Sequence, residues 1–233
     1  MTYRILIIAL AVALIAGAFI VLKESSFPGW VVKADHPLVI GGYGDNFSYS
    51  GTDVRPLSGK LELMFDPNAH TGTIAVSITT SEGSGPIRLS SEDSLTGEIT
   101  LSSRIGPDAS IITDTDIYGD TGIRGPELPM THALLAGESA FDLYLNGRLV
   151  YERLQGEWMV AQALRKEDGA IRKSGLYYSP LLRDKTGFAD PKRMEFTLIL
   201  HSTEPDSKND PPYTAALQLV FTSITVNQGP QPG

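Results

Sequence analysis

The chain of 233 residues contains no cysteine. This absence excludes structural disulfides, thiolate metal sites, thioether-linked haem and lipid attachment through cysteine. Exported domains often rely on disulfides, but a chain of this length can bury enough apolar surface to fold without them. The composition therefore predicts a domain that is stabilised by its hydrophobic core.

Histidine is scarce, and catalytic motifs are absent from the sequence. The four histidines (His36, His70, His132 and His201) lie at least 34 positions apart, so they form no local zinc-binding motif. No G-x-S-x-G or S-x-x-K nucleophile motif occurs, and the glycine-rich stretch 41–44 lacks the G-K-[ST] of a phosphate-binding loop. We therefore predict a non-enzymatic protein without a cofactor, with a hydrolase or metal-dependent enzyme as an alternative.

Positive charge is also in short supply. Lysine and arginine number 19 against 27 aspartates and glutamates, which gives a formal net charge of −8 at pH 7. Residues 1–24 hold two positive side chains and one negative side chain, so residues 25–233 carry −9. Nucleic acid and anionic lipid headgroups repel such a domain. We expect no nucleic-acid partner, and the acidic surface is either a solubilising feature or the mark of a cationic partner.

One apolar run stands out near the start of the chain. Ile5 to Leu22 contains 18 residues without a charged or polar side chain. As a helix this run spans about 27 Å, which is close to the thickness of the hydrocarbon core of a bilayer. Arg4 and the α-amino group make the N-terminal flank the positive one, which predicts a cytoplasmic N-terminus and a domain in the periplasm or outside the cell.

A cleaved signal peptide is the alternative for this segment. Ala16-Gly17-Ala18 has the small-residue pattern that signal peptidase accepts, but the mature chain would then begin at the apolar Phe19. We favour an uncleaved anchor. The predicted organisation is an anchor (1–23), a juxtamembrane linker (24–37) containing Pro28-Gly29 and Pro37, a β-rich extracytoplasmic domain (38–227) and a disordered tail (228–233).

Alternating apolar and polar residues dominate the rest of the chain and predict β-strands. Proline and glycine, 15 and 23 residues, are frequent enough for many tight turns. We predict an all-β fold, an antiparallel β-sandwich or squat β-barrel of about 8–10 strands. The apolar positions that carry this prediction are Leu61, Leu63 and Phe65; Ile74, Val76 and Ile78; Phe196, Leu198 and Leu200; and Leu217, Leu219 and Phe221.

Two local patterns make sharper predictions. Asn146-Gly147, flanked by β-forming residues, is the sequence of a type I′ hairpin turn, because both central residues need a positive φ. After Thr222 the apolar phase changes from odd to even positions, to Ile224 and Val226. A one-residue phase change predicts a bulge or bend at 222–223, with both apolar sets mostly buried.

The secondary structure of two segments is left open by the sequence. Residues 158–167 fit either a helix or a further strand, because Trp158, Met159, Ala163 and Leu164 would share one helical face. Pro129 to Ala136 fits a short helix, with proline early and Gly137 just past its end.

The best candidate for a metal site is the segment from Asp114 to Asp120. Asp114, Asp116 and Asp120 lie close to Gly119, and three carboxylates together can bind calcium. The spacing is not that of an EF-hand, however, and aspartate and glycine are also common in turns. We favour a plain acidic loop over a calcium site.

Five aromatic residues form the candidate ligand or partner surface. Aromatic side chains on a sheet face can line a pocket or an interface, although they can equally pack in the core. The five residues are Tyr144, Tyr151, Trp158, Tyr177 and Tyr178.

One stretch resembles a known family. Ser58-Gly59-Lys60 through Phe65-Asp66-Pro67, followed by a second β-forming run, is similar to the first hairpin of the lipocalin-like periplasmic family that binds polyisoprenoids. The similarity covers residues 56–80, and the rest of the chain shows no match to that family. The sequence alone thus assigns no family.

The sequence favours a membrane-tethered extracytoplasmic binding or assembly module, an accessory to a membrane complex with a protein partner in or at the membrane. The alternative is a lipocalin-like carrier of a lipid or other apolar ligand. Such a carrier needs an internal cavity lined by residues such as Phe65, Phe141, Phe196 and Phe221.

Overall fold

The computed structural model describes residues 27–42, 54–81, 84–118, 130–170, 189–208 and 212–229. These ranges contain twelve strands and no helix. No helix within them has the length and apolar character needed to span a bilayer. The predicted anchor and the last four residues of the predicted tail lie outside the described residues. The strands are β1 (Trp30–Asp35), β2 (Leu38–Ile40), β3 (Val54–Pro56), β4 (Ser58–Asp66), β5 (Thr71–Thr79), β6 (Glu98–Ile105), β7 (Ile111–Tyr118), β8 (Met130–Leu145), β9 (Arg148–Ala163), β10 (Asp190–His201), β11 (Ala216–Phe221) and β12 (Ile224–Gln228).

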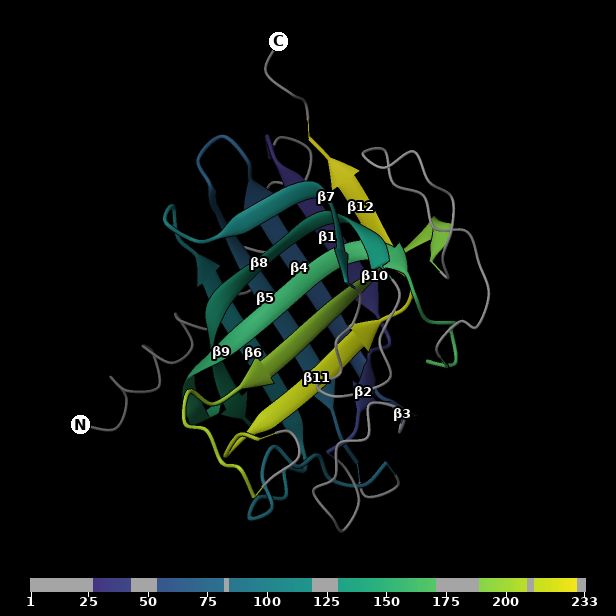
Figure 1. Ribbon diagram of the computed structural model, residues 1–233. Helices are drawn as coiled ribbons and strands as arrows, with labels where there is room; N and C mark the ends of the chain where they lie inside the picture. The colour runs from purple at the N-terminus through teal and green to yellow at the C-terminus, as the bar shows by residue number, and fades with distance from the viewer. Residues whose placement is uncertain are drawn as a thin grey trace, which may run out of the picture.

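The strands form one curled antiparallel sheet, a half-barrel, in the order β12-β1-β4-β5-β6-β8-β9-β10-β11-β2-β3. β7 pairs with β8 outside this path. In Figure 1, β8 to β11 cross in front of β4, β5 and β6, and the core lies between these two layers. The predicted all-β, antiparallel architecture is confirmed.

Two interrupted strands join the ends of the sheet. β1 pairs with β12, and after the interruption β2 pairs with β11. The register does not change between these ladders, because Val32 pairs with Val226 before the interruption and Val39 pairs with Leu219 after it. The chain segments 30–40 and 216–228 therefore run side by side through both ladders, β1 with β12 and β2 with β11.

The predicted break near Thr222 is confirmed. β11 ends at Phe221, Thr222 and Ser223 form a bend, and β12 begins at Ile224. All six side chains of β11 are buried, whereas Ile224 and Val226 of β12 are partly buried and pack against the core. The phase change thus marks the point where the strand passes from one end of the sheet to the other.

The core is built from the alternating positions that the sequence indicates. Leu61, Leu63 and Phe65 of β4 are buried, and their neighbours in the strand are more exposed, because successive side chains point to opposite faces. Phe196 and Phe221, on the paired strands β10 and β11, contact edge to face with ring centroids 6.1 Å apart. The main cluster draws side chains from β1, β2, β4, β5, β6, β8, β9, β10 and β11.

Several predicted boundaries need correction. Residues 30–35 of the predicted linker form β1, because Val31, Val32 and Ala34 are buried against the sheet. Residues 130–136 lie in β8, so the predicted helix there is wrong: pairing with β7 and β9 overrides the local helix signals. Of the ambiguous segment 158–167, residues 158–163 belong to β9.

The turn between β8 and β9 confirms the Asn146-Gly147 prediction. Asn146 has φ of 50° and Gly147 has φ of 76°, the left-handed values of a type I′ turn. The Asn146 side chain also accepts a hydrogen bond from the backbone N of Glu98, at 3.0 Å. This contact fixes the turn against the start of β6.

Gly147→Val should lower the free energy of unfolding by at least about 1 kcal/mol, because a Cβ is strained at positive φ. A Cβ at Gly147 would meet no atom within 4 Å, so the loss reports backbone conformation rather than a clash. Gly106→Val is the matched control: it is equally open but its φ is not left-handed, so we expect less than about 0.5 kcal/mol. Urea unfolding measures both variants, and equal stabilities would contradict the assignment of the turn.

Candidate functional site

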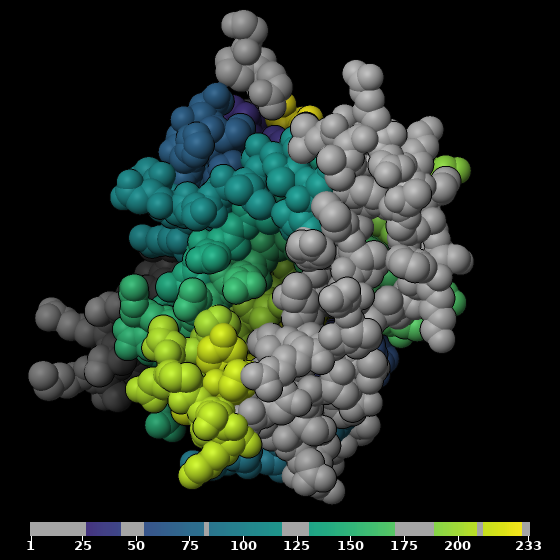
Figure 2. Space-filling view, in the orientation of Figure 1, coloured from purple at the N-terminus to yellow at the C-terminus, as the bar shows by residue number. Residues whose placement is uncertain are grey.

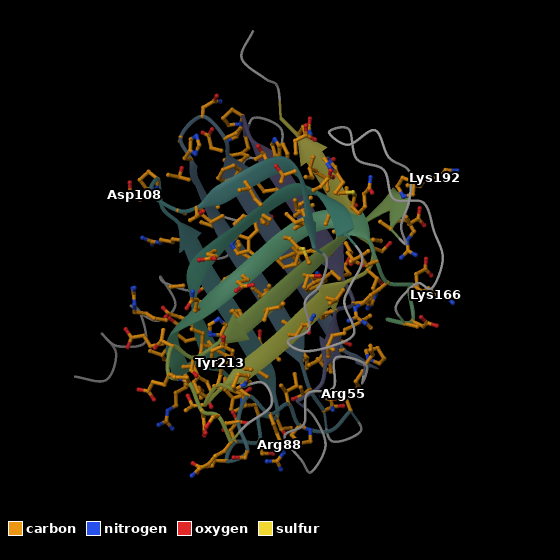
Figure 3. All side chains as sticks on the ribbon, in the orientation of Figure 1. Arg55, Arg88, Asp108, Lys166, Lys192 and Tyr213 are labelled. Atoms are coloured by element: carbon orange, nitrogen blue, oxygen red, sulfur yellow. The ribbon has the colours of Figure 1, made fainter. Side chains whose placement is uncertain are left out.

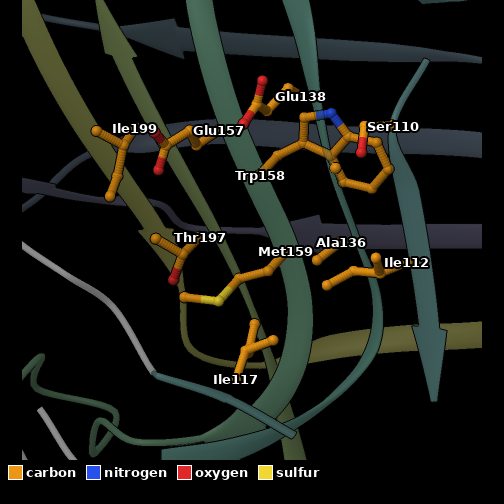
Figure 4. Close-up of a pocket in the computed structure, with 11 residues that line it drawn as sticks. Ser110, Ile112, Ile117, Ala136, Glu138, Glu157, Trp158, Met159, Thr197 and Ile199 are labelled. Atoms are coloured by element: carbon orange, nitrogen blue, oxygen red, sulfur yellow. The ribbon is translucent and has the colours of Figure 1, made fainter. Parts of the chain in front are cut away.

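A groove of about 260 Å³ lies on the outer face of β8, β9 and β10, beside β7 (Figure 4). Its floor is mainly apolar, and two glutamates stand at one end of it. The described residues that line it are Ser110, Ile112, Ile117, Ala136, Gly137, Glu138, Glu157, Trp158, Met159, Thr197 and Ile199.

Strand alternation explains why apolar residues face outward here. On β10, Phe196, Leu198 and Leu200 point into the core, so Thr197 and Ile199 point to the outer face. All six residues from Phe196 to His201 are nevertheless buried. Both faces of this strand are therefore shielded from water, unlike a sheet with one solvated face.

A second apolar cluster continues the floor of the groove. Ala133, Ala136, Met159 and Ala161 form it, and Ile117 of β7 packs against them. Small side chains on β8 beside the longer Met159 leave the hollow in the surface. Ile112 is 41% exposed at the rim, and it is one of three large hydrophobic residues that are at least 40% exposed among those described.

The two glutamates at the end of the groove are direct cross-strand neighbours. Glu138 of β8 pairs with Glu157 of β9, and both side chains are exposed. Like charges placed directly opposite each other in a sheet are destabilising. This arrangement is unfavourable for the isolated domain, and a cation between the two carboxylates would offset it.

Thr197 brings an unsatisfied polar atom to the same groove. Its side chain is 1% exposed, and its hydroxyl has no hydrogen-bond partner. A buried hydroxyl without a partner costs roughly 1–3 kcal/mol. A ligand atom in the groove that accepts or donates a hydrogen bond would remove this cost.

A second constellation joins β7 to β8 around His132. The Nδ1 atom of His132 lies 3.0 Å from Oδ1 of Asp116, and its Nε2 atom lies 2.9 Å from Oδ1 of Asp114. The His132 and Asp116 side chains are about 10% and 6% exposed, whereas Asp114 is 70% exposed. Since a neutral imidazole carries a single N–H, only the imidazolium form donates to both carboxylates.

This geometry bears on the predicted calcium loop. Asp114 and Asp116 lie in β7, not in a loop, and Asp120 lies outside the described residues. The Asp114 and Asp116 carboxylates lie at opposite nitrogens of the His132 ring. Within the described ranges no cluster of three or more histidine, aspartate or glutamate side chains is placed to hold a metal ion.

A third constellation links the loop before β6 to β9. The Tyr151 hydroxyl donates to Oδ2 of Asp93 at 2.8 Å, and the backbone N of Leu89 donates to Oδ1 of Asp93 at 2.9 Å. Burial raises the pKa of Asp93 above 3.8, although these hydrogen bonds and Arg88 act in the opposite direction. Burial, then the bond to Asp93, raises the pKa of Tyr151 to about 12.

This pair predicts an alkaline loss of stability. Because the pKa of Tyr151 is about 12 in the folded protein and 10.0 unperturbed, its contribution is complete below pH 10 and declines as pH rises towards 12. We expect wild type to lose stability between pH 10 and pH 12 relative to Tyr151→Phe. Urea unfolding across this range measures the difference.

The tyrosinate absorbance provides a control for this prediction. Asp93→Asn should lower the pKa of Tyr151 but leave it above 10, because burial is the larger cause. A titration in which Tyr151→Phe removes a phenol that ionises near pH 10 would contradict the assignment.

Of the five predicted aromatic residues, the structure describes three, and these three do not share one surface. Trp158 is 2% exposed in the core, its Nε1 donates to Oγ of Ser139 at 3.1 Å, and its indole also lines the groove. Tyr151 is partly buried at the rim of the core. Leu143 and Leu145 pack in the core, so Tyr144 between them faces the opposite side of β8. Tyr177 and Tyr178 lie outside the described residues.

Comparison with protein-family models, curated proteins and solved structures finds no match to this chain. The geometry of the site is therefore the basis for assigning a function.

The sequence did not predict the groove, the His132 cluster or the Asp93–Tyr151 pair. One signal was present for the groove: Ile199 and Met159 are apolar residues in the outward phase of their strands. The other two sites join residues that are distant in sequence, and only the strand pairing brings them together. The strand β7 was also not predicted, because aspartate, which occurs at Asp114 and Asp116, is uncommon in strands.

Proposed function

We propose that the protein is a membrane-tethered extracytoplasmic binding or assembly module that acts without catalysis as an accessory to a membrane complex. The observation that carries this proposal is the apolar groove on the outer face of β8–β10, with its opposed glutamates and its unsatisfied Thr197 hydroxyl. A hollow of this kind, lined by apolar side chains and a few polar groups, is typical of binding sites.

The tether follows from the sequence. Ile5 to Leu22 has the length of a bilayer-spanning helix, and the positive N-terminal flank directs the domain to the extracytoplasmic side. An anchor confines the domain to the membrane surface, which raises its concentration near a membrane-bound partner.

The His132 geometry supports a role other than catalysis. Each ring nitrogen faces a carboxylate, so neither is available to take a proton from a substrate in this arrangement.

The interior supports the binding module over the carrier. Phe65, Phe141, Phe196 and Phe221 are the side chains that would line an internal ligand cavity. All four are at most 1% exposed and belong to one core cluster. The groove lies on the outer face of the sheet, and Ile112 at its rim is 41% exposed.

For the fold itself we propose a squat barrel in place of a β-sandwich. The unchanged register between segments 30–40 and 216–228 supports closure, because it joins the two ends of the strand order. If each interrupted strand (β1 with β2, β3 with β4, β11 with β12) is counted once, eight strands form the path, with β7 outside it.

Site-specific photocrosslinking in intact membranes tests the binding role. A photoreactive residue at Ile112, on the rim of the groove, should give a discrete adduct with a membrane-associated protein. Val150 is 40% exposed at the far end of β9 and serves as the matched control, for which we expect no adduct. Equal labelling from both positions, or none from Ile112, would overturn the assignment of the groove.

The tether has its own test. Carbonate-washed membranes should retain the full chain, and protease should reach residues 25–233 from the extracytoplasmic side alone. Release of a soluble chain that begins at Phe19 or later would show that the segment is a cleaved signal peptide.

A further inference from the structure

The groove is one end of a longer furrow. A second hollow of about 570 Å³ shares Ser110 and Glu138 with it, and a third of about 510 Å³ shares Glu152, Arg153 and Thr203 with the second. Because they share lining residues, the three hollows adjoin one another. We call them together the furrow; it leads from the outer face of β10 over β8 and β9 to the loops at 90–92 and 202–206. Figure 2 shows β9 and residues 202–208 side by side at the lower left of this face.

The chemistry of the lining changes along the furrow. At the groove end, Ile112, Ile117 and Met159 give an apolar floor, and Thr197 adds its unsatisfied hydroxyl. From the middle onward the lining is acidic, and Arg153 is the one cation among the described residues that line it. The carboxylates are Glu138, Glu157, Glu152, Glu92, Glu204 and Asp206.

One wall of the acidic end is held in place by hydrogen bonds from two arginines. Arg55 donates to the backbone oxygens of Ser84 and Pro86, and Arg88 donates to the backbone oxygen of Asp93 at 2.6 Å. Both arginines lie at the lower end of the molecule (Figure 3). These bonds, with the Tyr151–Asp93 bond, fix the loop that carries residues 90–92.

Arg153 marks the junction of the second and third hollows. Its φ of 55° is left-handed, and its backbone N donates to Oδ1 of Asp142 at 2.9 Å. The pairing of β9 with β8 is irregular here, which is the signature of a β-bulge. The bulge turns Arg153 outward between two acidic hollows.

We propose that the furrow binds a segment of a partner protein in which apolar residues are followed by lysines or arginines. This inference rests on the proposed function and names the partner's chemistry. The apolar residues would fill the groove, with a backbone or side-chain polar atom reaching Thr197. The basic residues would lie among the carboxylates, between Glu138 and Glu157 first. The net charge of −9 on residues 25–233 would attract such a segment over a distance.

Binding of synthetic peptides to the full chain in a neutral detergent tests this proposal. The probe peptide has an apolar half and a lysine-rich half, and the controls are a scrambled peptide and one with glutamate in place of lysine. We expect saturable binding of the probe that weakens with salt. We expect weaker binding of the scrambled peptide and none of the acidic one.

Variants locate the site of binding. The double variant Glu138→Gln/Glu157→Gln should weaken binding by about fivefold to tenfold at low salt, and Ile112→Ser should weaken it by about threefold at any salt concentration. The matched control Glu98→Gln/Glu167→Gln removes the same charge outside the furrow, and it should change affinity by less than about twofold.

Equal losses in the two double variants, or equal binding of the probe and scrambled peptides, would overturn the proposal, because general charge attraction would then explain binding. Absence of probe binding would also overturn it. If photocrosslinking at Ile112 still succeeds in that case, the proposed function stands and the partner's chemistry alone is wrong.

Discussion

Phe141→Ala is expected to lower the free energy of unfolding by about 3–5 kcal/mol, the range for truncating a fully buried phenylalanine. The Phe141 side chain is 0% exposed and lies in the main core cluster between β6 and β9. Its loss removes apolar burial and leaves a cavity that the surrounding strands cannot readily fill. Urea unfolding followed by tryptophan fluorescence measures the loss.

Tyr144→Ala is the control for this prediction. Tyr144 lies in the same strand but faces away from the core, so its truncation should cost clearly less than that of Phe141. Similar losses for the two variants would contradict the assignment of the faces of β8.

Gly156→Ala should lower the free energy of unfolding by about 2–3 kcal/mol, although alanine is ordinarily better than glycine in a strand. A Cβ at Gly156 would lie 2.4 Å from two ring carbons of Phe141 and 2.9 Å from Leu200 Cδ2. The φ of Gly156 is not left-handed, so the loss reports space alone.

A double-mutant cycle separates this clash from other causes. In a Phe141→Ala background the added Cβ has room, and Gly156→Ala should become neutral or stabilising. Additive losses in the double variant would show that Gly156 and Phe141 do not compete for the same space.

The parts of the fold that follow from local patterns could be predicted from the sequence. The alternation of Leu61, Leu63 and Phe65 identified a strand and its buried face, and Asn146-Gly147 identified the tightest turn. The phase change at Thr222 identified a break, because a strand that buries residues on odd and then even positions cannot stay regular. In each case the physical cause acts within about ten residues.

The features that depend on distant pairing could not be predicted. Asp93 and Tyr151 lie 58 positions apart, and the β9 bulge at Arg153 brings the tyrosine to the rim of the core. The segment that begins with Trp158 and Met159 fitted a helix as well as a strand, because the two side chains could share one helical face or lie on opposite faces of a strand. The choice depends on β8 and β10, which pair with β9 along both edges.

The pairing of residues 30–40 with residues 216–228 has a consequence for biogenesis. β1 obtains its second hydrogen-bonding neighbour from β12, the last strand among the described residues. During synthesis this neighbour is made after β1, so one edge of β1 has no partner until residues 224–228 are complete. Such long-range contacts form slowly, and unpaired strand edges are prone to aggregate. The edge of β1 is therefore most open to aggregation until residues 216–228 have been synthesised.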